Sequence, residues 1–153
     1  MSPIAVISMV TGYLIQNYAE WRGGGPDLPN VGPMAGMAKA ASPAVKATAL
    51  QIISVVVVLG AALALIFHIG PLIDAIAAAL VVNALGQCVM SFRQRRLVSG
   101  TLTGAFLMLP ASVWVIATSS GPYGVLPLII GPVASFPILY IVWRIAFRIN
   151  AFG

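Results

Sequence analysis

Residues 49–70 read ALQIISVVVVLGAALALIFHIG, and this stretch decides the class of fold. It contains no Asp, Glu, Lys or Arg. An α-helix rises about 1.5 Å per residue, so a run of this length covers the hydrocarbon core of a bilayer, which is about 30 Å thick. The stretch therefore predicts a transmembrane helix.

The rest of the chain shares this character. Of its 153 residues, 60% are hydrophobic and only 7% are charged, and the mean hydropathy is +1.02. Soluble domains carry about 25% charged residues, so a soluble fold of this composition would lack the polar side chains that cover a surface. We expect one all-α integral membrane domain over residues 1–153, a helical bundle whose first partner is the lipid bilayer.

Apolar runs separated by short polar stretches give the predicted membrane spans. They are residues 4–21, 46–69, 71–92, 99–119 and 122–143. The first run is the least apolar, because Ser8, Gly12, Gln16 and Glu20 recur every four residues as a polar stripe. Two interpretations stay open: five transmembrane helices, or four together with an N-terminal helix that lies in the membrane interface.

Two kinds of connection join these runs. Gly70-Pro71 and Gly121-Pro122 predict two tight hairpins, because Gly readily ends a helix and Pro suits the first position of the next one. Residues 22–45 are rich in Gly and Pro and show no apolar periodicity, so we expect a cytoplasmic linker there.

Cationic residues gather on one side of the predicted topology. The eight are Arg22, Lys39, Lys46, Arg93, Arg95, Arg96, Arg144 and Arg148. Lys and Arg of short loops collect on the cytoplasmic face, which predicts an outer N-terminus and a cytoplasmic C-terminus. Arg93, Arg95 and Arg96 also fit contact with anionic lipid head groups. The net charge of +5 therefore reports topology, and we expect no nucleic-acid partner. With minimal outer turns and no eukaryotic sorting signal, the expected location is a bacterial inner membrane.

A proline ladder marks the last span. Residues 121–140 read GPYGVLPLIIGPVASFPILY, and Pro127, Pro132 and Pro137 are expected in the helix interior. Each proline removes a backbone N–H and so frees a carbonyl, which neighbouring helices can satisfy in a membrane. The ladder predicts either a polar hinge or cavity, or simple kinks that fit the helix to its neighbours.

Small and polar residues are expected to hold the helices together, because hydrophobicity cannot drive association within lipid. The candidate packing residues are Ala61, Ala79, Gly86, Gly100, Gly104 and Ala111, and their partners could belong to the same chain or to another. Asn83 and Gln87 fall within the third predicted span. They are expected either to bond to a neighbouring helix or to bind a polar solute or ion.

The sequence contains few residues that could form a catalytic or metal-binding site. His68 and Asp74 flank the first Gly-Pro turn, where they could pair or take a proton-linked or metal role, or simply complement the helix dipoles. Motifs for hydrolases, zinc proteases and phosphate binding are missing, and no acidic residue is expected deep in the membrane. We therefore expect no enzyme activity, cofactor or metal.

Three classes of function remain, of which an intramembrane enzyme or cofactor carrier is the least favoured, because it would require a group bound at His68, and the other two are as follows. The first is a non-enzymatic structural or accessory subunit of a membrane assembly, or a small homo-oligomer, because small-residue faces are abundant and catalytic groups are absent. The second is a passive transporter, channel or lysis-type pore that uses the proline-kinked fifth helix, with Asn83 and Gln87 near the conduction path. A continuous polar cavity along the third and fifth spans would favour the second function.

Overall fold

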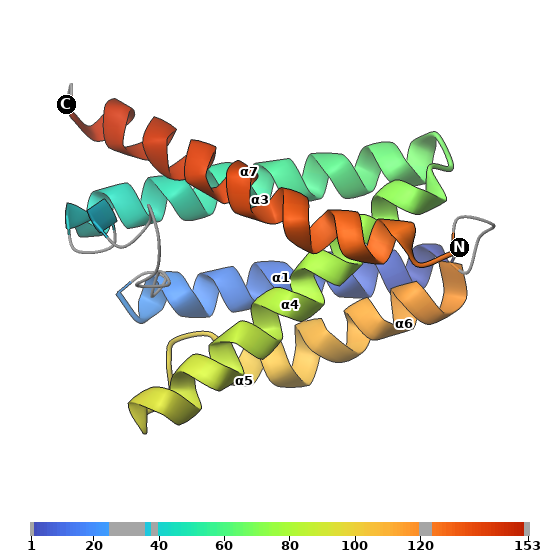
Figure 1. Ribbon diagram of the computed structural model, residues 1–153, viewed down its shortest axis with the longest axis horizontal. Coiled ribbons are helices and arrows are strands. Elements are labelled where there is room, and N and C mark those ends of the chain that lie inside the picture. The colour runs from blue at the N-terminus through green and yellow to red at the C-terminus, as the bar shows by residue number, and fades with distance from the viewer. Residues whose placement is uncertain (1, 25–35, 38–39, 120–123, 152–153) are drawn as a thin grey trace.

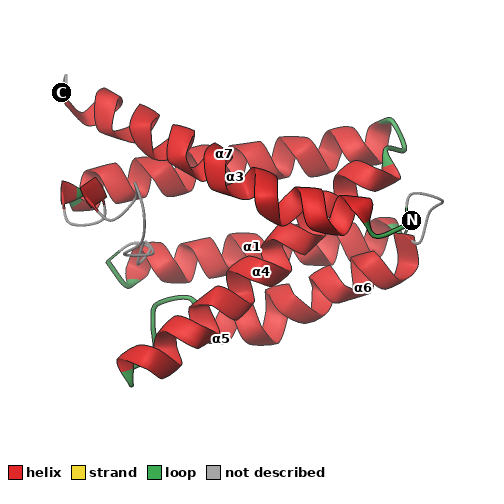
Figure 2. Ribbon diagram, in the orientation of Figure 1, coloured by secondary structure: helices red, strands yellow, loops and turns green. Residues whose placement is uncertain are grey.

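A computed structural model describes residues 2–24, 36–37, 40–119 and 124–151 of the chain. Within these ranges all regular structure is helical, as Figure 1 and Figure 2 show, which confirms the predicted all-α class. The elements are α1 (Pro3–Arg22), α3 (Pro43–Ile66), α4 (Gly70–Gln94), α5 (Thr101–Thr103), η1 (Gly104–Met108), α6 (Leu109–Ser119) and α7 (Leu126–Ala151). The short α5, the π-helical η1 and α6 follow one another without a break, so they form one long helix.

The helices lie side by side along the long axis of the molecule, and α4 packs against α3, α6 and α7 (Figure 1). The C-terminal ends of α1, α4 and α7 and the N-terminal end of α3 lie together at one end of the bundle. Every described Lys and Arg belongs to these ends or to the turn after α4. The expected gathering of cations at one end of the bundle is therefore present in the fold.

Four helices are long and apolar enough to cross a membrane. They are α3, α4, the continuous helix Thr101–Ser119 and α7. Large apolar side chains cover the outside of the bundle, among them Val55 of α3, Phe92 of α4 and Val133 of α7. This outward display of hydrophobic surface is what a bilayer accommodates and water does not. Helix α1 has the length of the others but is less apolar and falls outside this set.

Helices α1, α3 and α4 each have a proline in their first two positions. Ser2 and Ser42 cap α1 and α3 by accepting hydrogen bonds from backbone N–H groups, and a proline occupies the first position of each helix. Helix α4 begins at Gly70-Pro71 after a tight turn in which His68 adopts a left-handed conformation (φ 54°). The first predicted Gly-Pro hairpin is confirmed. The second, at Gly121-Pro122, lies outside the described residues.

Two helices extend beyond the predicted membrane spans. The last span is predicted to end at residue 143, and the helix that contains it, α7, continues to Ala151 and includes Arg144 and Arg148. Cationic side chains are favoured by the dipole at a helix C-terminus, so charge does not end the helix there. The linker predicted over residues 22–45 is shorter at its far end, because α3 already begins at Pro43. Most of that linker lies outside the described residues.

Candidate functional site

The polar stripe of α1 faces the interior of the bundle. Gly12, Gln16 and Glu20 are all buried, whereas apolar side chains on the other faces of the helix, including Ile4 and Trp21, are exposed. A helix lying in the membrane interface turns its polar face to water and its apolar face to lipid. Helix α1 has the reverse arrangement, with polar groups against protein and apolar groups outside.

Glu20 is the centre of this stripe. Its side chain is only 4% exposed although it lies in the last turn of α1. The Glu20 Oε1 atom accepts hydrogen bonds from Nε2 of Gln16, at 2.9 Å, and from Nε2 of Gln87 on α4. An ionised carboxylate only accepts hydrogen bonds, so two amide donors suit its charged form. Packing of α4 and the following helix covers the Glu20 side chain within the bundle, although the residue lies near the C-terminal end of α1.

Both amide groups donate to the carboxylate, and their oxygen atoms point elsewhere. Oε1 of Gln16 and Oε1 of Gln87 are buried, and neither has a hydrogen-bond partner among the described residues. Both lie over Gly104, since a Cβ atom added there would be 3.4 Å from the Gln16 oxygen and 3.3 Å from the Gln87 oxygen. Buried amide oxygens in native proteins are usually satisfied, so this convergence needs an explanation.

Glycine residues leave space for the side chains of Gln16, Glu20 and Gln87, which together form the Glu20 cluster. Gly100 adopts a left-handed conformation (φ 84°), and a Cβ atom there would lie 2.7 Å from Glu20 Cγ. Gly104 begins the π-helical segment η1, and a Cβ on Gly12 of α1 would be 3.1 Å from the backbone of Leu107 and Met108 in that segment. The absence of side chains at these positions lets α1 approach the second half of the chain closely.

The π-helical segment has a local cause. Pro110 follows it, and a proline ring within an α-helix collides with the carbonyl group four residues earlier, here that of Phe106. Widening the preceding turn to η1 is one way to relieve the collision. Segments of this kind occur often at functional sites, and here η1 borders the Glu20 cluster.

Further hydrogen bonds fix α1 and the turn before α5. Ser99 Oγ donates to the carbonyl of Ala19 at 2.8 Å. The hydroxyl groups of Ser91 and Thr101 are 2.7 Å apart, and Ser91 Oγ also accepts from the N–H of Val98 at 2.9 Å. These contacts hold the turn between α4 and α5 against the end of α1 that carries Glu20.

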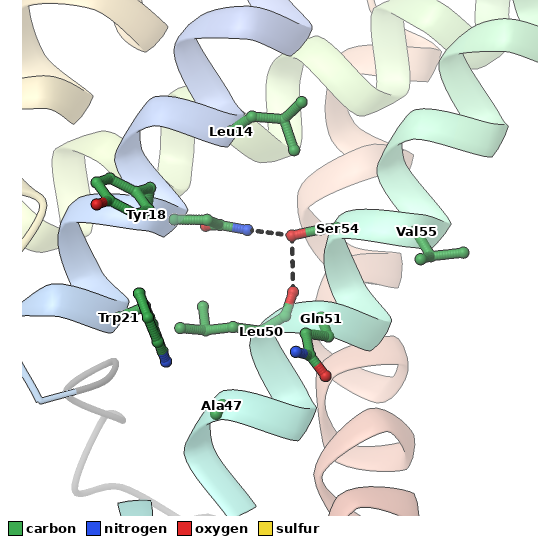
Figure 3. Close-up of a pocket in the computed structure, with 9 residues that line it drawn as sticks. Leu14, Tyr18, Trp21, Ala47, Leu50, Gln51, Ser54 and Val55 are labelled. Carbon is green, nitrogen blue, oxygen red and sulfur yellow. Dashed lines mark hydrogen bonds between the residues drawn. The ribbon is translucent and has the colours of Figure 1, made fainter. Parts of the chain in front are cut away.

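A second polar contact joins α1 to α3 and borders a surface groove of about 470 Å³. Asn17 Nδ2 donates to Ser54 Oγ at 2.8 Å, and Ser54 Oγ donates to the carbonyl of Leu50 at 2.7 Å. Figure 3 shows Ser54 and Leu50 between the two helices, with Tyr18 and Trp21 on the α1 side. The groove is open and mainly apolar, so lipid is its simplest occupant.

The predicted packing residues differ in how far they are buried and in what they contact. Ala61, Gly104 and Ala111 are buried, and Ala79 is half-buried. Gly100 contacts the side chain of Glu20 rather than a small-residue stripe. Gly86 is exposed, and a Cβ atom there would meet nothing within 4 Å. Gly86 therefore packs against no other described part of the chain.

Asn83 and Gln87 are only one turn of α4 apart but face different surroundings. Gln87 turns toward Glu20, as described above. Asn83 is exposed near the middle of α4 and makes no hydrogen bond to another described residue. It lies on the same outward face as Gly86, with the exposed side chains of Val82 and Leu85 nearby. The fold brings only Gln87 into a polar cluster.

His68 and Asp74 do not meet in this fold. His68 is exposed in the turn before α4. Asp74, in the second turn of α4, instead accepts a hydrogen bond from Ser119 Oγ at the end of α6. Within the described ranges, no three side chains of His, Cys, Asp or Glu come close enough to hold a metal ion.

The proline ladder packs against α4. Pro127 lies in the first turn of α7, so its predicted interior position is wrong, whereas Pro132 and Pro137 are inside the helix. Pro127 is buried and Pro137 is exposed. At Gly131 an added Cβ atom would lie 1.9 Å from the carbonyl oxygen of Ala75, so the backbones of α7 and α4 are in direct contact. A packed helix crossing occupies this part of α7.

The basic turn after α4 is exposed. Arg93 lies in the last turn of the helix, Arg95 caps it in a left-handed conformation (φ 50°), and Arg96 Nε donates to Gln94 Oε1 at 2.8 Å. All three arginines are exposed at the end of the bundle where the cations gather, here called the basic end.

No protein-family model matches this chain, and no curated protein or solved structure is significantly similar to it. Its function must be argued from its own residues. The residues that sequence reasoning missed are Gln16 and Glu20. Their spacing of four is visible in the sequence, but their role depends on which side of α1 meets the bundle.

Proposed function

We propose that this chain is a non-enzymatic polytopic membrane protein that acts as a structural or accessory subunit of a membrane assembly, or as a small homo-oligomer. The observation that carries this proposal is the outward face of α4. Asn83 exposes an amide that no described residue bonds to, near the middle of an apolar helix, and Gly86 on the same face leaves open space for a neighbour.

The hydrocarbon of a bilayer offers no hydrogen-bond partner to an amide group. A carboxamide without a partner in hydrocarbon is costly, whereas an amide on a second helix supplies both a donor and an acceptor. Small residues beside the amide let a second backbone approach closely, and interhelical amide bonds of this kind are worth about 1–2 kcal/mol in model helices. The Asn83 face therefore has the chemistry of a helix–helix interface.

A non-enzymatic role fits the described residues, among which no catalytic arrangement of side chains is assembled. His68 is exposed in a turn, and Ser112, although fully buried, has no hydrogen-bond partner within the described ranges that could activate it. The transport alternative depends on a polar path along α4 and α7. It is less favoured, because Gly131 packs on Ala75 and because Asn83 and Gln87 face different surroundings.

The proposal places five helices across a bacterial inner membrane. The inward polar stripe and outward apolar face of α1 support spanning over an interfacial position. The basic end, with Arg93, Arg95 and Arg96, would face the cytoplasm and its anionic lipids, and the N-terminus would lie outside.

Self-association tests the function. The protein is reconstituted in nanodiscs or mild detergent, and its mass and that of co-purifying chains are measured for the wild type and for Asn83→Leu. We expect a complex in the wild type that Asn83→Leu weakens about tenfold. Gln51→Leu is the matched control, because it removes an exposed amide from α3. A monomer in the wild type, or equal losses from both variants, would contradict the proposal.

Topology is tested separately. Replacing Arg93, Arg95 and Arg96 with glutamine removes three of the cations at the basic end. We expect mixed orientations, which is measured by the accessibility of single cysteines placed in the two predicted hairpin turns after Cys88 is replaced by Ala. A unique orientation in the triple variant would refute the charge argument.

A further inference from the structure

The buried oxygen cluster between α1, α4 and η1 has the composition of a cation site. Glu20 contributes a carboxylate, and Gln16 and Gln87 contribute amide oxygens with no hydrogen-bond partner in the described part of the chain. Gln16 is 0% exposed, and its oxygen and that of Gln87 converge over Gly104. We infer that this cluster binds an alkali cation of the sodium class, held by these three side chains.

The ligand atoms select a hard cation. Carboxylate and carbonyl oxygens suit hard ions, whereas sulfur and imidazole ligands, which favour softer metals, are not part of the cluster. The two amide oxygens already converge over Gly104, and Oε1 of Glu20 lies 3.1 Å from a Cβ atom added at Gly100, one turn earlier, so the three side chains line the same stretch of this helix. Neither Gly104 nor Gly100 has a side chain, so the polar side chains of the cluster lie close against the backbone of this helix.

The charge balance favours a single positive charge. One carboxylate and two neutral oxygens neutralise a monovalent ion, while a divalent ion would leave an excess charge in a buried site. A proton on Glu20 could satisfy only one of the two amide oxygens, so it explains less of the cluster than an ion with several oxygen ligands.

The C-terminal end of α1 also favours a cation at this cluster. Glu20 lies in the last turn of α1, where the backbone dipole is negative and disfavours a carboxylate but favours a cation. The neighbouring η1 interrupts regular α-helical bonding, and irregular backbone beside a helix C-terminus is a recurrent setting for sodium and proton sites in membrane proteins. This inference does not depend on the proposed assembly role.

Thermal unfolding in different salts tests the site. The full-length protein in nanodiscs or mild detergent is melted in sodium, lithium, potassium or choline chloride at constant ionic strength. We expect a saturable rise in Tm of several degrees with sodium relative to choline, because an ion that binds only the folded state stabilises it. The same Tm in all four salts would overturn the inference and would favour a buried water between the amide oxygens.

Variants test whether the rise in Tm with sodium comes from this cluster. Glu20→Gln and, as a second variant in case the first does not fold, Gln87→Leu are each expected to abolish the sodium-dependent rise. Asp74→Asn, a half-buried acid at the opposite end of α4, and Gln51→Leu, an exposed amide on α3, should retain it. A rise that survives in every folded cluster variant, or that disappears equally in the controls, would place the ion elsewhere and overturn the inference.

Discussion

The inward face of α1 and the proline-rich half of α7 are the two least ordinary stretches of this chain, and they pack in different ways. Helix α1 turns Gln16 and Glu20 into the bundle, where they meet Gln87 in a polar cluster. Helix α7 places Gly131 directly on the backbone of Ala75, and Pro137 faces outward. The polar stripe forms a candidate binding site, while the proline ladder forms a packed crossing.

The difference teaches how small residues are used in a bundle with lipid outside. At Gly131 a glycine brings two backbones into contact, and no polar side chain of the described residues lies among the nearest atoms to its missing Cβ. At Gly100 and Gly104 glycines leave space that polar side chains of other helices enter. One glycine therefore contributes tight packing, and the other two contribute room for chemistry.

The largest expected effect is at the α7 crossing. Gly131→Ala places a Cβ atom 1.9 Å from the carbonyl oxygen of Ala75, so α7 and α4 must separate. We expect a loss of about 3 kcal/mol in the free energy of unfolding, measured by denaturant titration in mixed micelles. Gly70→Ala, at the start of α4, is the control, because its Cβ would meet nothing within 4 Å and should change stability by less than about 0.5 kcal/mol. Similar losses from both would show that α7 does not pack closely at Gly131.

The next effect concerns the α1 cluster. Glu20→Leu removes the acceptor of two buried amide donors, and we expect a loss of about 2 kcal/mol. A double-mutant cycle with Gln87→Leu should give a coupling energy above about 1 kcal/mol, since the two side chains contact each other. Additive effects would mean that the two residues do not interact in the membrane.

A smaller effect is expected where α1 meets η1. Gly12→Ala puts a Cβ atom 3.1 Å from the η1 backbone, a distance that a shift of a few tenths of an ångström relieves. The expected loss is about 1 kcal/mol in the same titration. A change as large as that of Gly131→Ala would indicate that the α1 contact is as tight as the α7 crossing, and the contrast between them would disappear.

The smallest effect is expected within the proline ladder. Pro137 is exposed, and its kink is already accommodated by the surroundings of α7. Pro137→Ala should therefore change the free energy of unfolding by no more than about 0.5 kcal/mol. A loss above 2 kcal/mol would show that the bend itself is needed for the fold.

Local patterns explain which predictions held. The apolar runs, the Ser-Pro helix starts and the Gly70-Pro71 turn depend on residues that are neighbours in the sequence, so helix number and order could be predicted from them. Pro127 was misplaced in the helix interior because α7 starts only one residue before it. The sequence could not assign a partner to Gly86, because a small residue on a helix does not reveal whether its neighbour belongs to the same chain or to another.

By itself, the sequence determined an all-helical chain of five apolar runs, four of which are candidate spans in the structure, with its cations on one side of the predicted topology, because length, hydropathy and charge are properties of the chain. Only the tertiary structure decided the rotation of each helix about its axis. That rotation buries Glu20 and Gln87 together, leaves Asn83 and Gly86 outside, and sets Gly131 on Ala75. Polar and apolar side chains occur on several sides of each helix, so the rotation follows from contacts between segments far apart in the chain.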